Sequence, residues 1–286
     1  MKDKKILITG HTGVIGANFI KQFPDNNYVK CRIDIRNKKK VFSWIKKNNF
    51  DLFIHLAAIV SVKNVEKNLK DSFDVNFVGT KNIVDAFIKL KKKNFWFFYS
   101  STSHVYGSRE NFTPFKETDK TKPLNYYAKT KINSEKYIIK KLNKKNIKCC
   151  LGRIFSFTDI NQEPSFFIPS MFQKINSKKI KKFSLKDSDS LRDFIDVEEI
   201  VRSINLLYKK NSTGIFNICS GYHYSLQEIL LKISKLCKSK KKITFIKSQK
   251  RKNIIGNVNK LYNLIKKKPR SNLDKTLKKY WKKYYN

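Results

Sequence analysis

Residues 5–16 read Lys-Ile-Leu-Ile-Thr-Gly-His-Thr-Gly-Val-Ile-Gly, a short apolar run followed by three closely spaced glycines. The run at 6–9 predicts a β-strand, and the amphipathic residues from 13 to 23, which stop before Pro24, predict a helix. A glycine-rich turn between an amino-terminal strand and a helix is typical of phosphate binding, whereas the same glycines elsewhere carry little information. This stretch therefore predicts the first unit of a nucleotide-binding fold.

The three glycines suit a dinucleotide pyrophosphate for separate reasons. Gly10 allows the tight turn, Gly13 lets the backbone approach the phosphates, and Gly16 lets the helix pack on the sheet. The helix amino terminus adds free N–H groups and partial positive charge. We predict cofactor contacts from Gly10, Thr12, Gly13, Val14, Ile15 and Gly16.

The first half of the chain alternates short apolar runs with longer amphipathic stretches, the pattern of a parallel sheet covered by helices. Further strands are predicted at residues 28–35, 52–55, 95–99 and 147–153, and helices near 39–47, 72–90, 126–142 and 226–237. Loops are predicted around 158–169 and 187–193, and the carboxyl end is a tail rich in Lys and Tyr.

These elements predict an α/β fold, a Rossmann doubly wound parallel sheet with a smaller mixed α/β carboxyl-terminal substrate lobe. We assign residues 1–160 to an NAD(P)-binding Rossmann domain and residues 161–286 to a substrate-binding lobe. Part of 190–220 is expected to return to the Rossmann domain. No Pro- or Ser-rich linker separates independent domains.

The 286-residue chain carries 63 Lys and Arg against 22 Asp and Glu, a formal net charge of +41. Such an excess invites a nucleic-acid interpretation, because basic surfaces neutralise phosphates. The lysines, however, occur in short runs along most of the chain, with no single basic arm, RNA-recognition aromatic motif or zinc-finger spacing. We therefore expect no nucleic-acid partner and attribute the charge mainly to compositional drift, although it would attract an anionic substrate.

The five cysteines are odd in number and form no Cys-x-x-Cys pair, so neither disulfides nor a metal site is expected. None of the four histidines pairs with another at metal-ligand spacing. The amino terminus lacks the apolar stretch of a signal peptide, and the longest aromatic-apolar run, residues 95–99, is too short to cross a bilayer. We expect a cytoplasmic protein without membrane insertion.

Tyr127 and Lys131 form a Tyr-x-x-x-Lys pattern at the start of the predicted helix 126–142. Two further pairs share this spacing, Tyr137/Lys141 and Tyr262/Lys266. The first pair is selected by context, because it follows Thr102 at the end of a predicted strand, and ligands of open α/β sheets bind at that edge.

The spacing has a chemical purpose. Residues four apart share one helix face, so the Lys131 ammonium can lie beside the Tyr127 phenol and lower its pKa. Tyr127 can then exchange a proton with a hydroxyl or carbonyl as a hydride moves to or from a nicotinamide. We predict Thr102, Tyr127 and Lys131 as catalytic, with Thr102 bonded to the same oxygen and with Tyr127 and Lys131 also contacting the cofactor.

Taken in order, the motifs resemble those of the extended short-chain dehydrogenase/reductase family. They are Thr9–Gly16, His55–Ala58, Asn76 within 76–80, Ser101–Gly107, Tyr127/Lys131, Arg192–Phe194 and Asn217–Gly221, and they cover nearly the whole chain. The resemblance implies an NAD- or NADP-dependent enzyme that acts on a nucleotide-diphosphate sugar, with Thr102, Tyr127 and Lys131 as its triad. It also implies cofactor contacts from Leu56, Ala57, Ala58 and Asn76, and substrate-diphosphate contacts from Arg192 and Arg251. Because family members often dimerise through the helices near 72–90 and 126–142, a homodimer is one expectation.

Asp34 is the candidate acid for the adenosine end of the cofactor. The segment between the first helix and His55 is short, and residues 31–37 resemble the family's Asp-Ile-x-Asp piece, which usually ends the third strand and touches adenine. Asp34, with Ile35 beside it, can therefore face the ribose or the adenine, and nearby Arg36 can tolerate a 2′-phosphate. The sequence leaves NAD and NADP as alternatives.

Two departures from the family pattern bear on the reaction. Dehydratases of the family have Thr-Asp-Glu at the catalytic strand end, where this chain has Thr102-Ser103-His104, so elimination of water is not expected. Ser156 stands where epimerases commonly place a substrate-binding Asn, and the chain is shorter than typical epimerases. Ser103, His104 and Ser156 are predicted to contact the substrate.

The leading interpretation is therefore an NAD(P)-dependent reductase of a 4-keto (6-deoxy) nucleotide sugar, with Tyr127 as proton donor. A 4-epimerase that retains its NAD is the alternative, and a non-catalytic NAD(P)-binding protein is the third interpretation. The resemblance suggests a role in surface-polysaccharide precursors.

Overall fold

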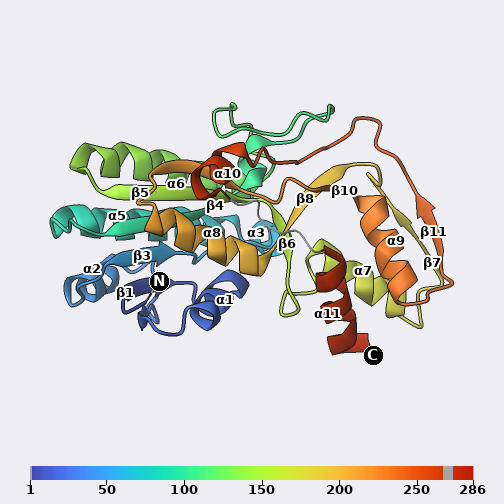
Figure 1. The fold of residues 1–286 in the computed structure, drawn as a ribbon, viewed down its shortest axis with the longest axis horizontal. Coiled ribbons are helices and arrows are strands. Elements are labelled where there is room, and N and C mark those ends of the chain that lie inside the picture. Colours follow the sequence, from blue (N-terminus) through green and yellow to red (C-terminus); the bar gives the residue numbers. More distant parts are fainter. Residues whose placement is uncertain (1, 267–272, 286) are drawn as a thin grey trace.

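A computed structural model describes residues 2–266 and 273–285. Its largest sheet is parallel throughout (Figure 1). In spatial order its strands are β2 (Asn27–Lys30), β1 (Lys5–Thr9), β3 (Leu52–His55), β4 (Trp96–Thr102), β5 (Lys148–Ile154) and β9 (Gly214–Ile218). Helices cover both faces, so the predicted doubly wound Rossmann sheet is confirmed.

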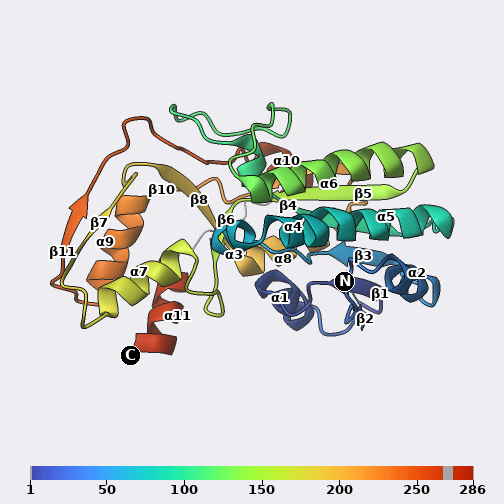
Figure 2. The same ribbon diagram turned by 180° about the vertical axis from the view of Figure 1, so that it is seen from behind.

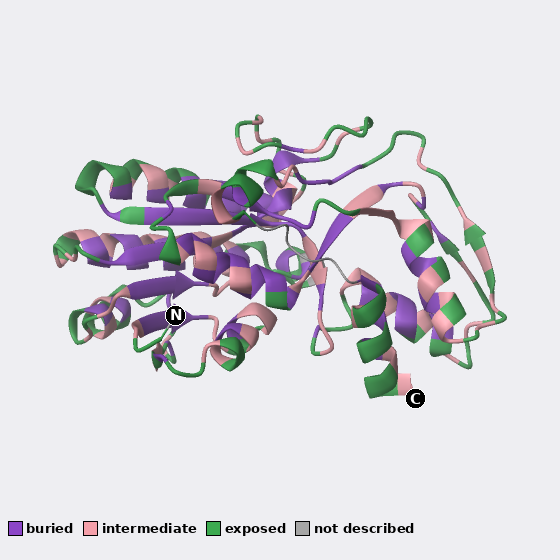
Figure 3. Cartoon of the chain, viewed as in Figure 1, coloured by how far each residue is buried: buried purple, intermediate pink, exposed green. Residues whose placement is uncertain are grey.

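The central strands are apolar on both sides because both faces of the sheet are covered. β3 reads Leu-Phe-Ile-His and β4 begins Trp-Phe-Phe-Tyr, and all of these residues are buried (Figure 3). Successive side chains point to opposite faces, so Ile6 and Ile8 pack into one core and Leu7 into the other.

Each face carries its own helical layer. One layer consists of α2 (Lys38–Lys46), α5 (Gly79–Lys89) and α6 (Tyr126–Leu142) (Figure 2). The opposite layer consists of α1 (Val14–Gln22), α8 (Val197–Lys209) and α10 (Asn259–Ile265) (Figure 1). Segments from late in the chain therefore complete both the sheet and one of its layers.

A second lobe lies beyond one end of the sheet (Figure 1). Its core is built from α7 (Phe167–Asn176), α9 (Leu226–Leu236) and α11 (Leu273–Tyr285), with β7 (Lys182–Leu185) paired to β11 (Lys242–Phe245). A three-stranded sheet adjoins it, formed by β10 (His223–Ser225), β8 (Leu191–Asp196) and β6 (Ser156–Thr158). The smaller mixed α/β lobe is thus present.

The predicted strand at 28–35 is too long, because β2 ends at Lys30. The Cys31 N–H still donates to Ile8 O at 2.8 Å, but a turn follows, in which the Asn37 N–H donates to Asp34 O. Asn37 then caps α2 through its side chain. Only one described strand therefore lies on this side of β1, where the common Rossmann order has two.

Other predicted boundaries also move. The single helix predicted at 72–90 is α4 (Leu69–Phe73), a π-helical turn η1 (Asp74–Val78) and α5 in succession. The predicted loop at 187–193 overlaps β8, which begins at Leu191, and much of the Lys/Tyr-rich tail is the helix α11. The remaining short elements are α3 (Val62–Lys67), η2 (Ser103–Tyr106) and η3 (Asn143–Lys145).

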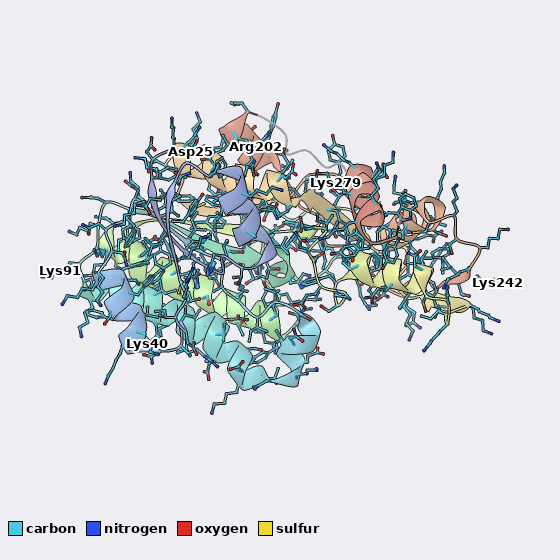
Figure 4. All side chains as sticks on the ribbon, turned by 90° about the horizontal axis from the view of Figure 1, so that it is seen from below. Asp25, Lys40, Lys91, Arg202, Lys242 and Lys279 are labelled. Atoms are coloured by element: carbon cyan, nitrogen blue, oxygen red, sulfur yellow. The ribbon has the colours of Figure 1, made fainter. Side chains whose placement is uncertain are left out.

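The positive charge extends over both lobes. Lys40 and Lys91 lie at one end of the molecule and Lys242 at the other, and lysine side chains project outward between them (Figure 4). No helix in the described residues is both long and apolar enough to cross a bilayer.

We predict that Phe53→Ala lowers the free energy of unfolding by about 3–5 kcal/mol, because it empties the centre of a core. Phe53 is fully buried and contacts the rings of Trp44, Phe50, Phe87 and Phe97. Urea denaturation of the two proteins measures the difference. Leu231→Ala, at a residue 46% exposed on α9, is the control and should cost less than about 1 kcal/mol. An equal cost for both variants would contradict this account of the core.

Candidate active site

The turn after β1 has the geometry that its glycines predict. Gly10 has a φ of +70°, and a Cβ there would lie 2.6 Å from the Ala57 nitrogen. A Cβ on Gly16 would lie 2.3 Å from the Gly10 oxygen, so only glycine allows α1 to pack this closely. Gly13 is the N-cap of α1, and no side chain occupies its capping position. The first amides of α1 therefore stay available to an anion, which fits a dinucleotide pyrophosphate.

A buried hydrogen-bond chain through His55 fixes this turn to its neighbours. The His55 ring contacts Thr9 Oγ1 through Nδ1 at 2.6 Å and Thr80 Oγ1 through Nε2 at 2.9 Å. Thr80 donates to the Asn76 oxygen at 2.7 Å, and the Ala57 N–H donates to Thr9 Oγ1 at 3.3 Å. Burial lowers the pKa of His55 to about 3, so the ring is neutral. Sequence reasoning had discarded His55 as a metal ligand and missed this role.

Asn76 lies in the π-helical turn η1, an element often found at functional sites. Its side chain accepts from the Ile59 N–H at 2.8 Å, donates to the Ile59 oxygen at 3.0 Å and donates to Thr130 Oγ1 at 3.2 Å. Both amide N–H groups are therefore engaged by the protein. Asn76 holds the segment after Ala58 against α6, and its direct contact with a cofactor stays a prediction.

The structure places Asp34 in an exposed turn, where Arg36 occupies its carboxylate. Arg36 Nε donates to Asp34 at 2.9 and 3.0 Å and Nη2 donates at 2.7 Å, while Nη1 contacts Asp71. Ile35 is buried against Gly79, where a Cβ would meet it at 2.6 Å. Asp34 and Arg36 thus neutralise each other. Each is therefore less available for its predicted cofactor contact, Asp34 with the ribose or adenine and Arg36 with a 2′-phosphate.

Thr102, Tyr127 and Lys131 converge at the carboxyl end of β4. Thr102 is the last residue of that strand, and Tyr127 lies in the first turn of α6, close enough to Thr102 for that hydroxyl to lower the pKa of the phenol. The Lys131 ammonium lies 5.8 Å from the centre of the Tyr127 ring. The structure therefore brings together the three residues predicted as catalytic, and it fits a proton donor held beside a hydroxyl.

The electrostatics of this group differ from the prediction. We expected Lys131 to lower the pKa of Tyr127, but burial raises the pKa of the phenol, and only Thr102 lowers it. Lys131 donates to the Ser100 oxygen at 2.8 Å and lies 4.7 Å from the Tyr99 ring centre. Burial lowers its own pKa to about 7, because few charges compensate it. Because its pKa is raised, the Tyr127 phenol is protonated in this structure.

A buried ion pair below Lys131 was not predicted. Arg153 donates to Glu135 through Nη2 at 2.7 Å and Nε at 3.1 Å, and both side chains are almost fully buried. Ser101 donates to the same carboxylate. Glu135 also raises the pKa of Lys131, so its charge partly offsets the burial of that amine. Its position four residues after Lys131 on α6 was the available signal.

On the substrate side, Arg192 of β8 comes close to His104 of η2. Burial of His104 and, to a smaller extent, the positive charge of Arg192 lower the pKa of His104 to about 4, so the imidazole is neutral. Asn125 approaches His104 Nδ1 at 3.4 Å. Burial also lowers the pKa of Arg192 to about 10, and of the carboxylates only Asp187 opposes that shift. Arg192 Nη1 donates to the Leu191 and Lys252 carbonyl oxygens, but the guanidinium forms no ion pair with a carboxylate of the described residues, which suits a phosphate ligand.

The other residues predicted to contact the substrate are Ser103, Ser156 and Arg251, and they do not all lie beside the catalytic group. Ser103 is buried in η2 beside Thr102, and Ser156 begins β6, which pairs with β8. Arg251 already donates to Asp189 at 3.0 Å and lies 4.9 Å from the Phe112 ring centre. The predicted diphosphate contact of Arg251 therefore competes with an existing carboxylate partner.

Comparison with known proteins identifies the family. A family model described as GDP-mannose 4,6 dehydratase matches residues 21–279. The chain belongs to this family. The resemblance to extended short-chain dehydrogenases, stated from the motifs, is thereby confirmed.

Two curated proteins resemble the chain over most of its length. A GDP-6-deoxy-D-talose 4-dehydrogenase from Aggregatibacter actinomycetemcomitans is 29% identical over 91% of this chain and 91% of its own. A UDP-glucose 4-epimerase from Mycoplasma pneumoniae is 26% identical over 79% of each chain. Proteins of similar identity to this chain are therefore named for different reactions.

Solved structures agree on the fold. RMD from Pseudomonas aeruginosa, complexed with NADPH, superposes with a TM-score of 0.85 at 21% identity and covers 96% of both chains. The UDP-glucose 4-epimerase of Thermus thermophilus, complexed with NAD, gives 0.85 at 17% identity and covers 98% of this chain and 99% of its own. At these identities the likeness establishes the architecture alone.

We predict that Lys131→Met stabilises the protein below pH 7 by about 1–3 kcal/mol, because it removes a buried ammonium. The lysine pKa is about 7 in the folded chain and about 10.4 when unfolded, so the wild type pays its full penalty below pH 7 and regains stability as the pH rises toward 10. Urea denaturation at pH 6 and pH 9.5 should show the advantage of the variant shrinking. Lys129→Met, at an exposed position of the same helix, is the control. If Lys131→Met is less stable than wild type at pH 6, the Lys131 ammonium does not destabilise the folded protein.

Proposed function

We propose that this chain is an NAD(P)-dependent oxidoreductase that reduces a 4-keto (6-deoxy) nucleotide sugar, with Tyr127 as the proton donor. The observation that carries the proposal is the convergence of Thr102, Tyr127 and Lys131 at the carboxyl end of β4, opposite Arg192. A protonated phenol, a second hydroxyl, a buried amine and a phosphate-binding cation are the groups that such a reduction requires.

The residues have separate roles in this reaction. The Thr102 hydroxyl holds the substrate carbonyl oxygen, and the Tyr127 O–H donates its proton to that oxygen, which leaves the product as an alcohol. The bound nicotinamide supplies the hydride. Lys131 then stabilises the phenolate that remains on Tyr127 and returns a proton to it, for which a pKa of about 7 is well placed.

The two lobes divide the ligands in this proposal. Residues 1–160 hold the dinucleotide through the Gly10–Gly16 turn, and the lobe formed by 161–286 holds the sugar nucleotide through Arg192. β9 and α8 belong spatially to the Rossmann sheet, in keeping with the proposed return of part of 190–220. The homodimer stays a prediction.

The relatives support a reaction at carbon 4. The 29% identical relative is named as a 4-dehydrogenase of a 6-deoxy sugar attached to GDP, and it matches 91% of this chain. Ser103-His104 replaces the acid pair of the family's dehydratases, which favours reduction over elimination.

A 4-epimerase is the second candidate, favoured by the UDP-glucose 4-epimerases among the relatives. The purified protein, mixed with NADH or NADPH and a panel of 4-keto-6-deoxy nucleotide sugars, separates the two. Stoichiometric loss of the reduced cofactor supports the reductase. Tightly retained NAD with interconversion of an unreduced nucleotide sugar supports the epimerase instead.

We predict that Tyr127→Phe lowers kcat by about 100-fold or more, because it removes only the proton donor. Cofactor affinity should stay within about threefold, since the ring is kept. Tyr137→Phe is the matched control, because Tyr137 begins another Tyr-x-x-x-Lys pair on α6 but bonds to Asp85. Turnover that survives in Tyr127→Phe would show that Tyr127 is not the proton donor. If the wild-type protein binds the cofactor but turns over none of the substrates, a non-catalytic function is favoured.

We also predict that Arg192→Lys raises KM for the nucleotide sugar by about tenfold with a smaller change in kcat. The substitution keeps the charge but loses the planar guanidinium, so about one charge-assisted hydrogen bond to phosphate is lost. Steady-state kinetics with the identified substrate measure both constants. A fall in kcat at unchanged KM would place Arg192 away from the diphosphate.

A further inference from the structure

We propose that the adenosine end of the cofactor site selects a ribose 2′-phosphate, so that the chain uses NADP(H), with Lys30, Arg32 and His11 as the recognising groups. This inference rests on the proposed function and decides between the two cofactors that it leaves open. It concerns the carboxyl end of β2, the residues just after it and His11 of the glycine turn.

The end of β2 is where dinucleotide-binding folds distinguish the two cofactors. An acid near this point bonds to the ribose hydroxyls of NAD, whereas a basic residue accommodates the 2′-phosphate of NADP. Here Lys30 is the last residue of the strand and pairs with Ile8 of β1, and the Cys31 N–H donates to Ile8 O at 2.8 Å. Lys30 and Arg32 therefore stand beside the strand that runs into Gly10.

Asp34, the acid that follows β2, is not free to bind the ribose. Asp34 accepts three hydrogen bonds from the Arg36 guanidinium and one from the Arg36 backbone N–H. Arg36 also forms an ion pair with Asp71 of α4. The Asp34 carboxylate is therefore already bound within the protein. Arg36, the basic residue considered in the sequence analysis, is a poor ligand for the 2′-phosphate because two carboxylates already bind it.

Lys30 and Arg32, by contrast, are exposed and form no ion pair or side-chain hydrogen bond with the described residues. Both lie close enough to His11 for their charges to lower its pKa, after the effect of burial. The Nδ1 atom of His11 is buried and has no hydrogen-bond partner. Two exposed cations without an ion-pair partner in the described residues and an unpartnered ring nitrogen thus lie near one another beside the glycine turn.

A phosphate monoester satisfies all three groups at once. It brings up to two negative charges and several acceptor oxygens, so it neutralises the cations and can bond to the imidazole once Nδ1 carries a proton. The amides of α1 serve a different anion, the pyrophosphate. The remaining anion of such a cofactor is the 2′-phosphate.

Calorimetric titration of the full-length protein tests this directly, with adenosine 2′,5′-bisphosphate and adenosine 5′-phosphate as the probes. We expect the bisphosphate to bind at least tenfold more tightly, and NADPH to exceed NADH by a similar factor. The double variant Lys30→Ala/Arg32→Ala should lose at least about tenfold in bisphosphate affinity while its affinity for adenosine 5′-phosphate stays within about twofold.

Lys21→Ala/Lys46→Ala is the matched control, because it removes two exposed lysines and the same net charge from α1 and α2. It should keep the bisphosphate preference, and circular dichroism should show all variants folded. Equal wild-type affinities for the two probes, an unchanged preference in Lys30→Ala/Arg32→Ala, or equally tight adenosine 3′,5′-bisphosphate would overturn the inference. If NADH binds as tightly as NADPH and supports reduction, the inference fails and the proposed function stands. If neither dinucleotide binds, both fail.

Discussion

The hydrogen bonds of His55 determine how the loops at the sheet's carboxyl edge are placed. Thr9 Oγ1 accepts from the Ala57 N–H, and its single hydroxyl proton is available to His55 Nδ1. Thr80 gives its proton to the Asn76 oxygen, so His55 must donate to Thr80 through Nε2. Each donor in the chain has one acceptor, and only the neutral ring with its proton on Nε2 completes it. The low pKa that burial imposes keeps the ring in that state.

Buried charge is concentrated around Lys131, and it is there that stability and the proposed chemistry oppose each other. Arg153 and Glu135 form a paired and hydrogen-bonded unit, whereas Lys131 has a carbonyl and an aromatic ring as its nearest partners. An ammonium held this way costs folding free energy, because the lost hydration is only partly replaced. Because Lys131 does not stabilise the fold, its presence is better explained by the proposed catalytic role, proton exchange with Tyr127.

The sequence predicted the parts of the site that depend on local rules. The glycines of the first turn, the Tyr127/Lys131 spacing and the limits of α6 follow from steric freedom, helix periodicity and capping, which act within a few residues. The strand at 28–35 and the loop at 187–193 were wrong because sheet pairing decides where a strand ends, and pairing joins residues distant in sequence. The same holds for Glu135–Arg153 and the contacts of Asn76, which depend on how β5, α6 and η1 come together. The raised pKa of Tyr127 is also a tertiary effect, since burial outweighs the effect expected from a neighbouring lysine.

The shortened sheet changes what surrounds the adenosine end of the cofactor site. With one described strand outside β1, the chain turns at Cys31 and enters α2 within a few residues, stabilised by Asp34 and the Asn37 cap. A carboxylate needed to hold that turn against Arg36 is not available to a ribose hydroxyl. The side chains left beside the glycine turn are then Lys30 and Arg32, so the loss of a strand and the basic character of this edge have one structural origin. A preference for an additional phosphate therefore follows from how the chain shortens its fold, independently of its overall positive charge.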